Sequence, residues 1–418
     1  MEVDIQIPQF FICPISLQIM RDPVTTVTGI TYDRESIEKW LLTAGENPLC
    51  PVTNQPLAKD SDLTPNHTLR RLIQSWCADN ASYGVDRIPT PKPPLDKFRV
   101  MKMMRDLDHP HLKTQVLMQL EILATDNDRN RKYMVEAGLP KAMLMFLTTC
   151  FNKRKIDRGL EEALNILRLI RTPSSELLEN NQMIESLTWV LGYDEENQNQ
   201  TFMVKSYAGM ILKTIIKTAN SHFLERLKPE FFQTLVGVLR TARKNNVSYQ
   251  VGNINTVLNI LLNVCSWGRN RVMMVQSGAV FELVEMELDS PLDRETTELI
   301  LGILFHLCSC AEGRAEFLSH SGGIAVVSKR IMKVSETADY RAVLILSLIG
   351  KASSGSSIVI GEMLRVGAVS KLFMILQGDS AGYLKKKARE ILRLHSDEWK
   401  KSPCFDASLL IRCGVSTR

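Results

Sequence analysis

The chain has 418 residues, of which 44% are hydrophobic and 23% are charged, and its formal net charge is +5 at neutral pH. This apolar fraction is ordinary for a folded chain and excludes wholesale disorder. The slight excess of positive charge is far from the dense basic surface of a typical nucleic-acid-binding protein. The length allows about two to four domains, or one small domain followed by a repeat array.

Other features of the whole chain concern its location. No stretch approaches the ~20 consecutive apolar residues that cross a bilayer, so no integral membrane segment is expected. The first residues, Met1-Glu2-Val3-Asp4, are acidic and lack the basic start of a signal peptide. Nine scattered cysteines do not make a disulfide framework and suit a reducing compartment. We therefore expect a cytoplasmic protein, with the nucleus as an additional location.

The N-terminal part contains two short loops that each begin with Cys-Pro. The first reads Cys13-Pro14-Ile15-Ser16 and the second reads Cys50-Pro51-Val52-Thr53. A zinc-binding RING finger would need a second cysteine at the positions of Ser16 and Thr53. Residues 17–49 contain neither cysteine nor histidine, so the ligands are too few and no metal is expected. Hydroxyl and carboxylate groups can cross-link such loops by hydrogen bonds instead.

Around these loops the pattern predicts a small α+β fold with a helix over residues 35–42. Tyr32, Asp33 and Arg34 follow an expected strand and open this helix, where an acidic residue suits the helix dipole, so we interpret them as structural. The expected core residues are Phe11, Ile37, Leu57, Leu69 and Ile73.

A proline-rich segment separates this head from the rest of the chain. Residues 88–94 read Ile-Pro-Thr-Pro-Lys-Pro-Pro, which resists helix and sheet and favours an extended linker. We place the linker at 81–98, after a head at 5–80. Residues 1–77 have a net charge of −3, and the remainder of the chain therefore has +8.

The long C-terminal part repeats. Apolar helical segments recur at spacings of 42 to 50 residues around Leu123, Leu167, Leu212, Leu262, Leu304, Leu346 and Leu392. Four of them are followed by a short segment that ends at Gly138, Gly278, Gly322 or Gly367, where we expect a left-handed helix cap. This period is typical of stacked helical repeats. An irregular helical bundle with coincidental spacing is the alternative, and the pattern is weaker over residues 153–246.

The repeating part resembles armadillo repeats, and the head resembles a U-box, the zinc-free relative of RING domains. Together they make the chain similar to plant U-box/armadillo E3 ubiquitin ligases, near the small subgroup linked to stress and immunity. The resemblance implies a mostly α fold: a small α+β U-box followed by an all-α armadillo solenoid. We place the array, of about six to seven units, at 99–400, and a C-terminal tail at 401–418.

The resemblance also implies contacts with a ubiquitin-charged E2 enzyme. Ile15 and Leu17 occupy the first-loop contact positions, although either residue also suits the core. Pro51 occupies the second-loop position, where the alternative is a rigid turn residue. Trp40 occupies the helix position, and aromatic anchors often carry interface energy. Ligases of this type often place a basic residue where Asn54 stands. Asn54 is a candidate to bridge E2 and ubiquitin through hydrogen bonds without a charge; the alternatives are a less tightly held pose or a bridge from another residue.

Other residues are weaker candidates. Thr64 and Thr90 precede proline and are candidate phosphorylation sites. The expected substrate groove includes Asn165, Arg168, Asn259 and Asn263, although an asparagine in a stacked helix often only bonds the backbone. Cys308 and Cys310 are interpreted as buried thiols, and Cys404 and Cys413 lie in the tail. The basic run 385–387, with Arg389 and Arg393, is interpreted as a solvated helix face, with nuclear import or an acidic partner as alternatives.

The leading hypothesis is thus an E3 ubiquitin ligase that forms no covalent ubiquitin intermediate and holds its substrate on the array. Its partners would be an E2 enzyme, ubiquitin, a protein substrate and a second copy through the U-box, with no nucleic acid. No cofactor is expected. The first alternative is a non-catalytic armadillo adaptor or scaffold, and the second is a basic solenoid that binds cargo or nucleic acid.

Overall fold

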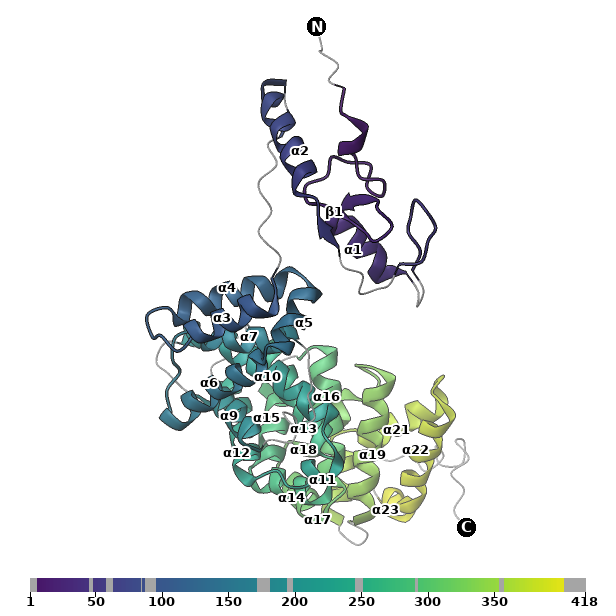
Figure 1. The fold of residues 1–418 in the computed structure, drawn as a ribbon. Coiled ribbons are helices and arrows are strands. Elements are labelled where there is room, and N and C mark those ends of the chain that lie inside the picture. The colour runs from purple at the N-terminus through teal and green to yellow at the C-terminus, as the bar shows by residue number, and fades with distance from the viewer. Residues whose placement is uncertain are drawn as a thin grey trace. The chain divides into compact units, whose positions relative to one another are not determined.

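The computed structural model describes residues 6–44, 48–57, 63–83, 85–86, 95–170, 181–193, 198–244, 251–289, 292–352 and 357–401. The chain divides into two compact units, Met1–Pro94 and Leu95–Arg418. We call them the N-terminal unit and the array, and each is described by itself (Figure 1).

The N-terminal unit combines a small sheet with two helices. Its three-stranded antiparallel sheet has the order β2-β1-β3, and Val24 of the central strand pairs with Tyr32 and with Pro65. The predicted helix over 35–42 forms and extends by one residue at each end. The elements are η1 (Gln9–Phe11), β1 (Pro23–Thr25), β2 (Thr31–Asp33), α1 (Arg34–Thr43), β3 (Thr64–Pro65), α2 (His67–Asp79) and η2 (Ala81–Tyr83).

Helix α2 closes the core of this unit. Its first turn is capped by Asn66, whose side-chain oxygen accepts a hydrogen bond from the Leu69 amide at 3.0 Å. The helix buries Ile73 and Cys77. The core prediction is confirmed: four of the expected residues are buried and the fifth packs against them while partly exposed. The buried residues are Phe11, Ile37, Leu57 and Ile73, and the partly exposed one is Leu69.

The array is built entirely from helices over its described residues. Their bounds are α3 (Lys97–Asp106), α4 (Lys113–Asp126), α5 (Asp128–Glu136), α6 (Leu139–Lys153), α7 (Leu160–Ile170), α9 (Asn181–Gly192), α10 (Gln198–Thr218), α11 (Ser221–Leu224), α12 (Pro229–Lys244), α13 (Val251–Val264), α14 (Gly268–Gln276), α15 (Ala279–Asp289), α16 (Arg294–Cys308), α17 (Ala311–Ser319), α18 (Gly323–Arg330), α19 (Glu336–Ala352), α20 (Ser357–Arg365), α21 (Ala368–Gln377), α22 (Gly382–Leu394) and α23 (Ser396–Lys401).

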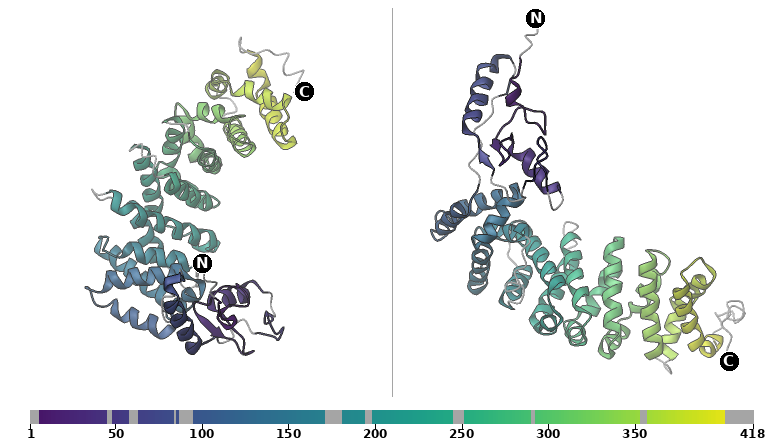
Figure 2. Two further views of the ribbon diagram at one scale, coloured as in Figure 1. Left: turned by 90° about the horizontal axis from the view of Figure 1, so that it is seen from above. Right: turned by 45° about the vertical axis from the view of Figure 1, so that its right-hand side comes forward.

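These helices follow one another as a short first helix, a second helix and a long third helix. Each third helix packs on the third helix of the next repeat, and this series is α4, α7, α10, α13, α16, α19 and α22. The second helices form a parallel series of α6, α9, α12, α15, α18 and α21. We call the first series the third-helix layer. The regular stacking, visible as a curved row in Figure 2, is that of a repeat solenoid and not of an irregular bundle.

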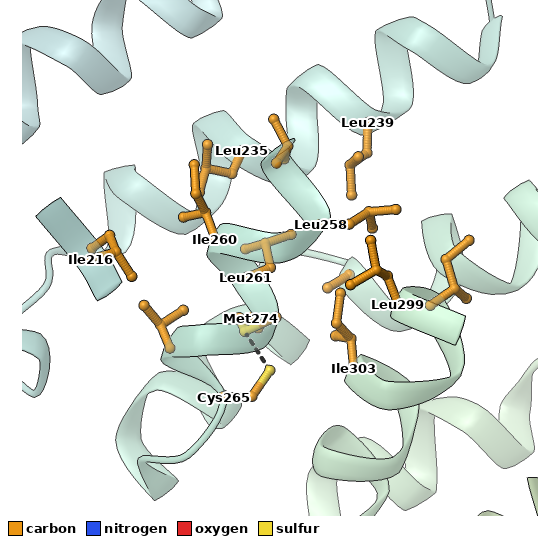
Figure 3. Packing of buried hydrophobic residues seen from close by; sticks show 14 of the residues in the cluster. Ile216, Leu235, Leu239, Leu258, Ile260, Leu261, Cys265, Met274, Leu299 and Ile303 are labelled. Carbon is orange, nitrogen blue, oxygen red and sulfur yellow. Dashed lines mark hydrogen bonds between the residues drawn. The ribbon is translucent and has the colours of Figure 1, made fainter. Parts of the chain in front are cut away.

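The core of the array runs continuously between the two layers. In its middle, side chains of successive helices interdigitate, as Figure 3 shows for Leu235 and Leu239 of α12 against Leu258 and Leu261 of α13. All four of these side chains are fully buried. No repeat could bury this apolar surface alone, so stacking stabilises each one.

In three repeats, an arginine ties the short first helix to the C-terminal end of the third helix before it. Arg131 of α5 donates to the Ala124 carbonyl at 2.6 Å, Arg271 of α14 to the Cys265 carbonyl at 3.1 Å, and Arg314 of α17 to the Cys308 carbonyl at 3.0 Å. The carbonyls at a helix C-terminus lack intrahelical partners and attract a cation. This contact therefore holds the sharp turn from one repeat into the next.

The turn glycines behave as expected with one exception. Gly138, Gly278 and Gly367 take the left-handed conformation, with φ of 84°, 82° and 75°. Gly322 has φ of −93°, so the prediction of a left-handed cap there is wrong. A Cβ on Gly322 would lie 2.8 Å from Leu288 Cδ1, the end of a side chain that is 48% exposed and can shift.

The boundary between the units lies inside the proline-rich segment. Of the predicted linker 81–98, residues 81–83 form η2, and Leu95 is buried in the core of the array. Asp96 caps α3, which begins at Lys97. Within the described residues, no single helix is long and apolar enough to cross a membrane. One pair, α5 and α6, has sufficient length and apolar character only when the two helices are taken together, and they are bent by 73° relative to each other.

Candidate functional site

The two Cys-Pro loops of the N-terminal unit have the same backbone structure. In the first loop, the Cys13 amide donates to the Gln18 carbonyl at 2.8 Å and the Leu17 amide donates to the Cys13 carbonyl at 2.9 Å. The second loop repeats both bonds with Cys50, Gln55 and Asn54, at 2.8 and 2.9 Å. The two loops are therefore structural copies. Sequence reasoning missed this equivalence, although the matching patterns Cys-Pro-x-x-x-Gln were its signal.

Strand β2 holds both loops through the cysteine sulfurs. The Asp33 amide donates to Cys13 Sγ at 3.3 Å, and the Tyr32 hydroxyl lies 3.1 Å from Cys50 Sγ. The Thr28 hydroxyl donates to Cys50 Sγ at 3.3 Å. Hydrogen bonds thus act at the positions where a RING finger has zinc ligands. Within the described part of the chain, no group of three or more metal-ligating side chains comes together.

These bonds change the acidity of the sulfurs. Burial opposes ionisation of Cys50, but hydrogen bonds from Thr28, Thr53 and Tyr32 outweigh it and lower the pKa of the thiol to about 6. Burial likewise opposes ionisation of Cys13, and backbone hydrogen bonds, first that of Ser16, lower its pKa as well. Thiolate accepts hydrogen bonds more strongly than thiol, so ionisation tightens the second loop.

The stability of the N-terminal unit is therefore expected to depend on pH through Cys50. Its folded pKa of about 6 lies below the ordinary 9.0, so the unfolded state binds more protons between these values. The contribution to unfolding free energy is absent below pH ~6, grows up to pH ~9 and is complete above it. Thermal melts should show a gain of up to about 1.4 kcal/mol per pH unit in this window.

Cys50→Ser is expected to lose this rise, because a serine hydroxyl does not ionise there. Cys77→Ser is the matched control, since Cys77 is buried and desolvation raises its pKa. Equal pH slopes for wild type and Cys50→Ser would contradict the assignment.

A largely buried ionic cluster joins the segment before β1 to both helices. Asp22 accepts a hydrogen bond from Arg34 Nε of α1 at 2.7 Å and pairs with Arg70 of α2 through its other oxygen. The Asp33 carboxylate accepts from the backbone amides of Arg21 and Asp22 at 2.7 and 2.9 Å. Asp33 is structural as predicted, but it does not cap α1 with its side chain.

Apolar side chains are exposed on the loops and on α1. Leu17 is 77% exposed, and Trp40 is 40% exposed. The indole nitrogen of Trp40 donates to the Leu49 carbonyl at 3.0 Å, which ties α1 to the second loop. Ile15 is partly buried and packs against the core, and Pro51 is partly buried. Of the predicted contact residues, Trp40 is thus joined to the loop that carries Pro51.

Backbone strain marks the same loops. Leu17 and Asn54 have φ of 55° and 57°, in the left-handed region. Asparagine tolerates this conformation, whereas it costs a leucine free energy. Sequence reasoning did not predict the strain at Leu17. Asn54 is exposed at the equivalent place on the second loop.

The other predicted residues have diverse positions. Thr64 is exposed in β3, where it pairs with Thr25 of β1. Thr90, Cys404 and Cys413 lie outside the described residues. Cys308 is buried, and Cys310 donates from its sulfur to the Leu307 carbonyl at 3.1 Å.

In the array, the predicted groove residues are engaged with their neighbours. Asn165 is buried and donates to the Glu121 carboxylate of α4, while Arg168 donates to Asn165 Oδ1 at 3.0 Å and 2.6 Å. The Arg168 guanidinium also lies 5.2 Å from the ring of Tyr207 on α10. This network links three adjacent third helices, and sequence reasoning missed Tyr207, which belongs to it.

Asn259 and Asn263 both bond the backbone of their own helix. Asn259 Nδ2 donates to the Asn255 carbonyl at 2.7 Å, and Asn263 Nδ2 donates to the Asn259 carbonyl at 2.7 Å. Both amide nitrogens thus bond the backbone, as the alternative to a groove role expected. Both residues still lie on the surface of α13, partly or fully exposed.

Comparison with known proteins shows which family the chain belongs to. A U-box domain family model matches residues 7–82, and the model described as plant U-box protein ARM repeat region matches residues 99–414. Among curated relatives from Arabidopsis thaliana, the E3 ubiquitin-protein ligase PUB24 is 43% identical over 98% of this chain and 97% of its own length. The E3 ubiquitin-protein ligase PUB23 is 41% identical over 98% of each chain.

A solved chain from work on the interaction between cadherin and beta-catenin has a TM-score of 0.58. It covers 84% of this chain and 62% of that chain at 14% identity, which is a likeness of fold alone. Together with the two family matches, this confirms the predicted fold of a U-box followed by an armadillo array. The chain belongs to the plant U-box proteins with an armadillo repeat region, and it is a U-box E3 ubiquitin-protein ligase.

Proposed function

We propose that the U-box docks a ubiquitin-charged E2 enzyme through Ile15, Leu17, Trp40 and Pro51. The ligase supplies no nucleophile, and ubiquitin passes directly from the E2 thioester to a substrate lysine. Catalysis is then proximity and orientation of the two reactants. Asn54 would face both E2 and ubiquitin as an uncharged hydrogen-bonding residue.

The observation that carries this proposal is Leu17. An apolar side chain that is 77% exposed, on a backbone with φ of 55°, is unfavourable for an isolated unit. Such strain persists where a function needs the side chain at that place. Trp40 of α1 is also 40% exposed, and large exposed apolar side chains are typical interface anchors.

The third-helix layer is proposed to hold the protein substrate. Its helices leave one exposed stripe each, because their other sides pack on the second helices and on adjacent third helices. Asn165, Arg168, Asn259 and Asn263 all belong to this layer. A substrate bound there would be carried by the same chain as the charged E2, which raises its effective concentration.

We also propose that the ligase is regulated by phosphorylation and that it is located in the cytoplasm or nucleus. Phosphorylation of Thr64 would add about −1.5 to −2 charges to an exposed strand and alter self-association of the U-box. Thr90 in the linker is proposed as a second site. The free thiols among the described cysteines accord with a cytoplasmic or nuclear location. A role in stress or immune signalling rests on family resemblance.

The experiment is a reconstituted reaction with ubiquitin, E1, a panel of E2 enzymes and the full chain. We expect E2-dependent self-ubiquitination, and we expect Ile15→Ala to weaken it because the mutation truncates an interface anchor, at about 1–3 kcal/mol. Ile15 also packs against the core, so thermal melting of the variant is measured alongside. Undiminished transfer by a folded Ile15→Ala protein with every E2 would refute the docking assignment.

A further inference from the structure

The last third helix carries an unusual concentration of positive charge. Between Gly382 and Leu394, helix α22 contains five basic residues and one acidic residue, Glu390. The apolar side of the helix is used by the array, since Leu384, Ala388, Ile391 and Leu392 are buried. The remaining sides carry the basic residues, which include the exposed Lys386 and Arg393.

Two tyrosines lie on the exposed stripe beside these charges. Tyr340 of α19 and Tyr383 of α22 meet edge to face, with ring centroids 5.0 Å apart and an interplanar angle of 87°. They are 37% and 53% exposed, so the pair offers ring surface to solvent. Leu394, at the other end of α22, is 49% exposed. Helices α19 and α22 pack directly on each other (Figure 1), and the tyrosine pair joins their exposed sides.

The single carboxylate of α22 is surrounded by ammonium groups. A hydrogen bond from Lys387, at 2.9 Å, lowers the pKa of Glu390, and the charges of Lys387, Lys351 and Lys386 lower it further. One carboxylate cannot neutralise three cations, so the surroundings keep a net positive potential. We call Tyr340, Lys351, Tyr383, Lys386 and Lys387 the basic aromatic patch.

We propose that the basic aromatic patch binds an acidic segment of the protein substrate in which apolar side chains separate the carboxylates. This inference rests on the proposed function of the third-helix layer and names its substrate class. Charge complementarity selects the acidic groups, and the exposed tyrosine pair and Leu394 give apolar side chains a surface to contact. The carboxylate of Glu390 within the patch disfavours the evenly spaced phosphates of a nucleic acid.

The test is fluorescence polarisation with the full chain and a short labelled peptide of repeated Glu-Glu-Leu units. We expect this peptide to bind more tightly than its Gln-Gln-Leu counterpart, and added salt to weaken its binding. The double variant Lys351→Glu/Lys386→Glu should weaken binding about tenfold, because it reverses two charges in the patch. Tyr383→Ala should weaken it without changing the salt dependence.

The matched control is Lys97→Glu/Lys102→Glu, which makes the same charge change on two exposed residues of α3, outside the third-helix layer. Equal loss with this control, equal binding of the Glu and Gln peptides, or equal binding of a labelled oligo-dT would each overturn the proposal. Self-ubiquitination in the same preparations reports on the U-box separately. A wild-type chain that does not bind the Glu-Glu-Leu peptide but still self-ubiquitinates therefore refutes this inference and leaves E2 docking standing.

Discussion

Replacement of Leu17 by glycine is expected to reduce E2-dependent ubiquitin transfer about fivefold to 150-fold while the U-box stays folded. The side chain is 77% exposed, so its removal takes almost no packing from the core. Glycine also adopts the left-handed conformation at φ of 55° without strain. An interface anchor contributes about 1–3 kcal/mol of binding free energy. This corresponds to the stated loss of rate when the ligase concentration limits the reaction.

Stability should change little, because two effects oppose each other. Relief of strain stabilises the variant by about 1 kcal/mol, and the greater freedom of glycine in the unfolded state offsets about 0.5–1 kcal/mol. Leu72→Ala is the matched control, as it truncates another leucine that is 51% exposed, on α2. Rates and melting temperatures are measured with one E2 panel. Wild-type transfer by Leu17→Gly would show that Leu17 makes no E2 contact.

Local signals in the sequence were sufficient for the architecture. The lack of a second cysteine at the positions of Ser16 and Thr53 can be recognised from spacing alone, and the structure shows hydrogen bonds to the sulfurs of Cys13 and Cys50. The period of the apolar helices can likewise be recognised from the order of residues along the chain alone. The prediction for Gly322 was wrong because a glycine after a short helix does not by itself require a positive φ, and here φ is −93°.

Contacts between distant residues could not be predicted in this way. Asn165 and Glu121 are 44 residues apart, and their bond depends on how two helices stack. The periodicity placed Asn165 on α7 but not on a particular side of it. Positive φ at Leu17 was also hidden, because no local rule assigns a left-handed backbone to leucine. In the second loop the equivalent residue is Asn54, and asparagine is a residue type that suggests a left-handed backbone.

The ionic cluster at Asp22 is a second contact between residues far apart in the sequence that could not be predicted. Its loss should destabilise the protein more than the other proposed substitutions. Asp22→Ala is expected to destabilise the U-box by about 3–5 kcal/mol. Asp22 and its partners Arg34 and Arg70 have side chains that are only 18%, 14% and 13% exposed. Removal of the carboxylate leaves two largely buried cations, and Arg70 already has a buried Nε without a partner.

A loss of this size is a large part of the ~5–15 kcal/mol that holds a typical domain together. Thermal melts of the full chain should therefore show the U-box transition at a much lower temperature, with the array transition unchanged. Glu38→Ala is the control, since Glu38 pairs with Arg34 at 3.5 Å as an i,i+4 neighbour and is more exposed; it should cost less than about 1 kcal/mol.

The double variant Asp22→Ala/Arg70→Ala separates an uncompensated charge from a simple loss of packing. Because Arg70 no longer remains buried without its carboxylate, the double variant should be less destabilised than the sum of the two single variants. Strict additivity, or an Asp22→Ala melt like that of Glu38→Ala, would show that the cluster does not hold α1 and α2 against the segment before β1.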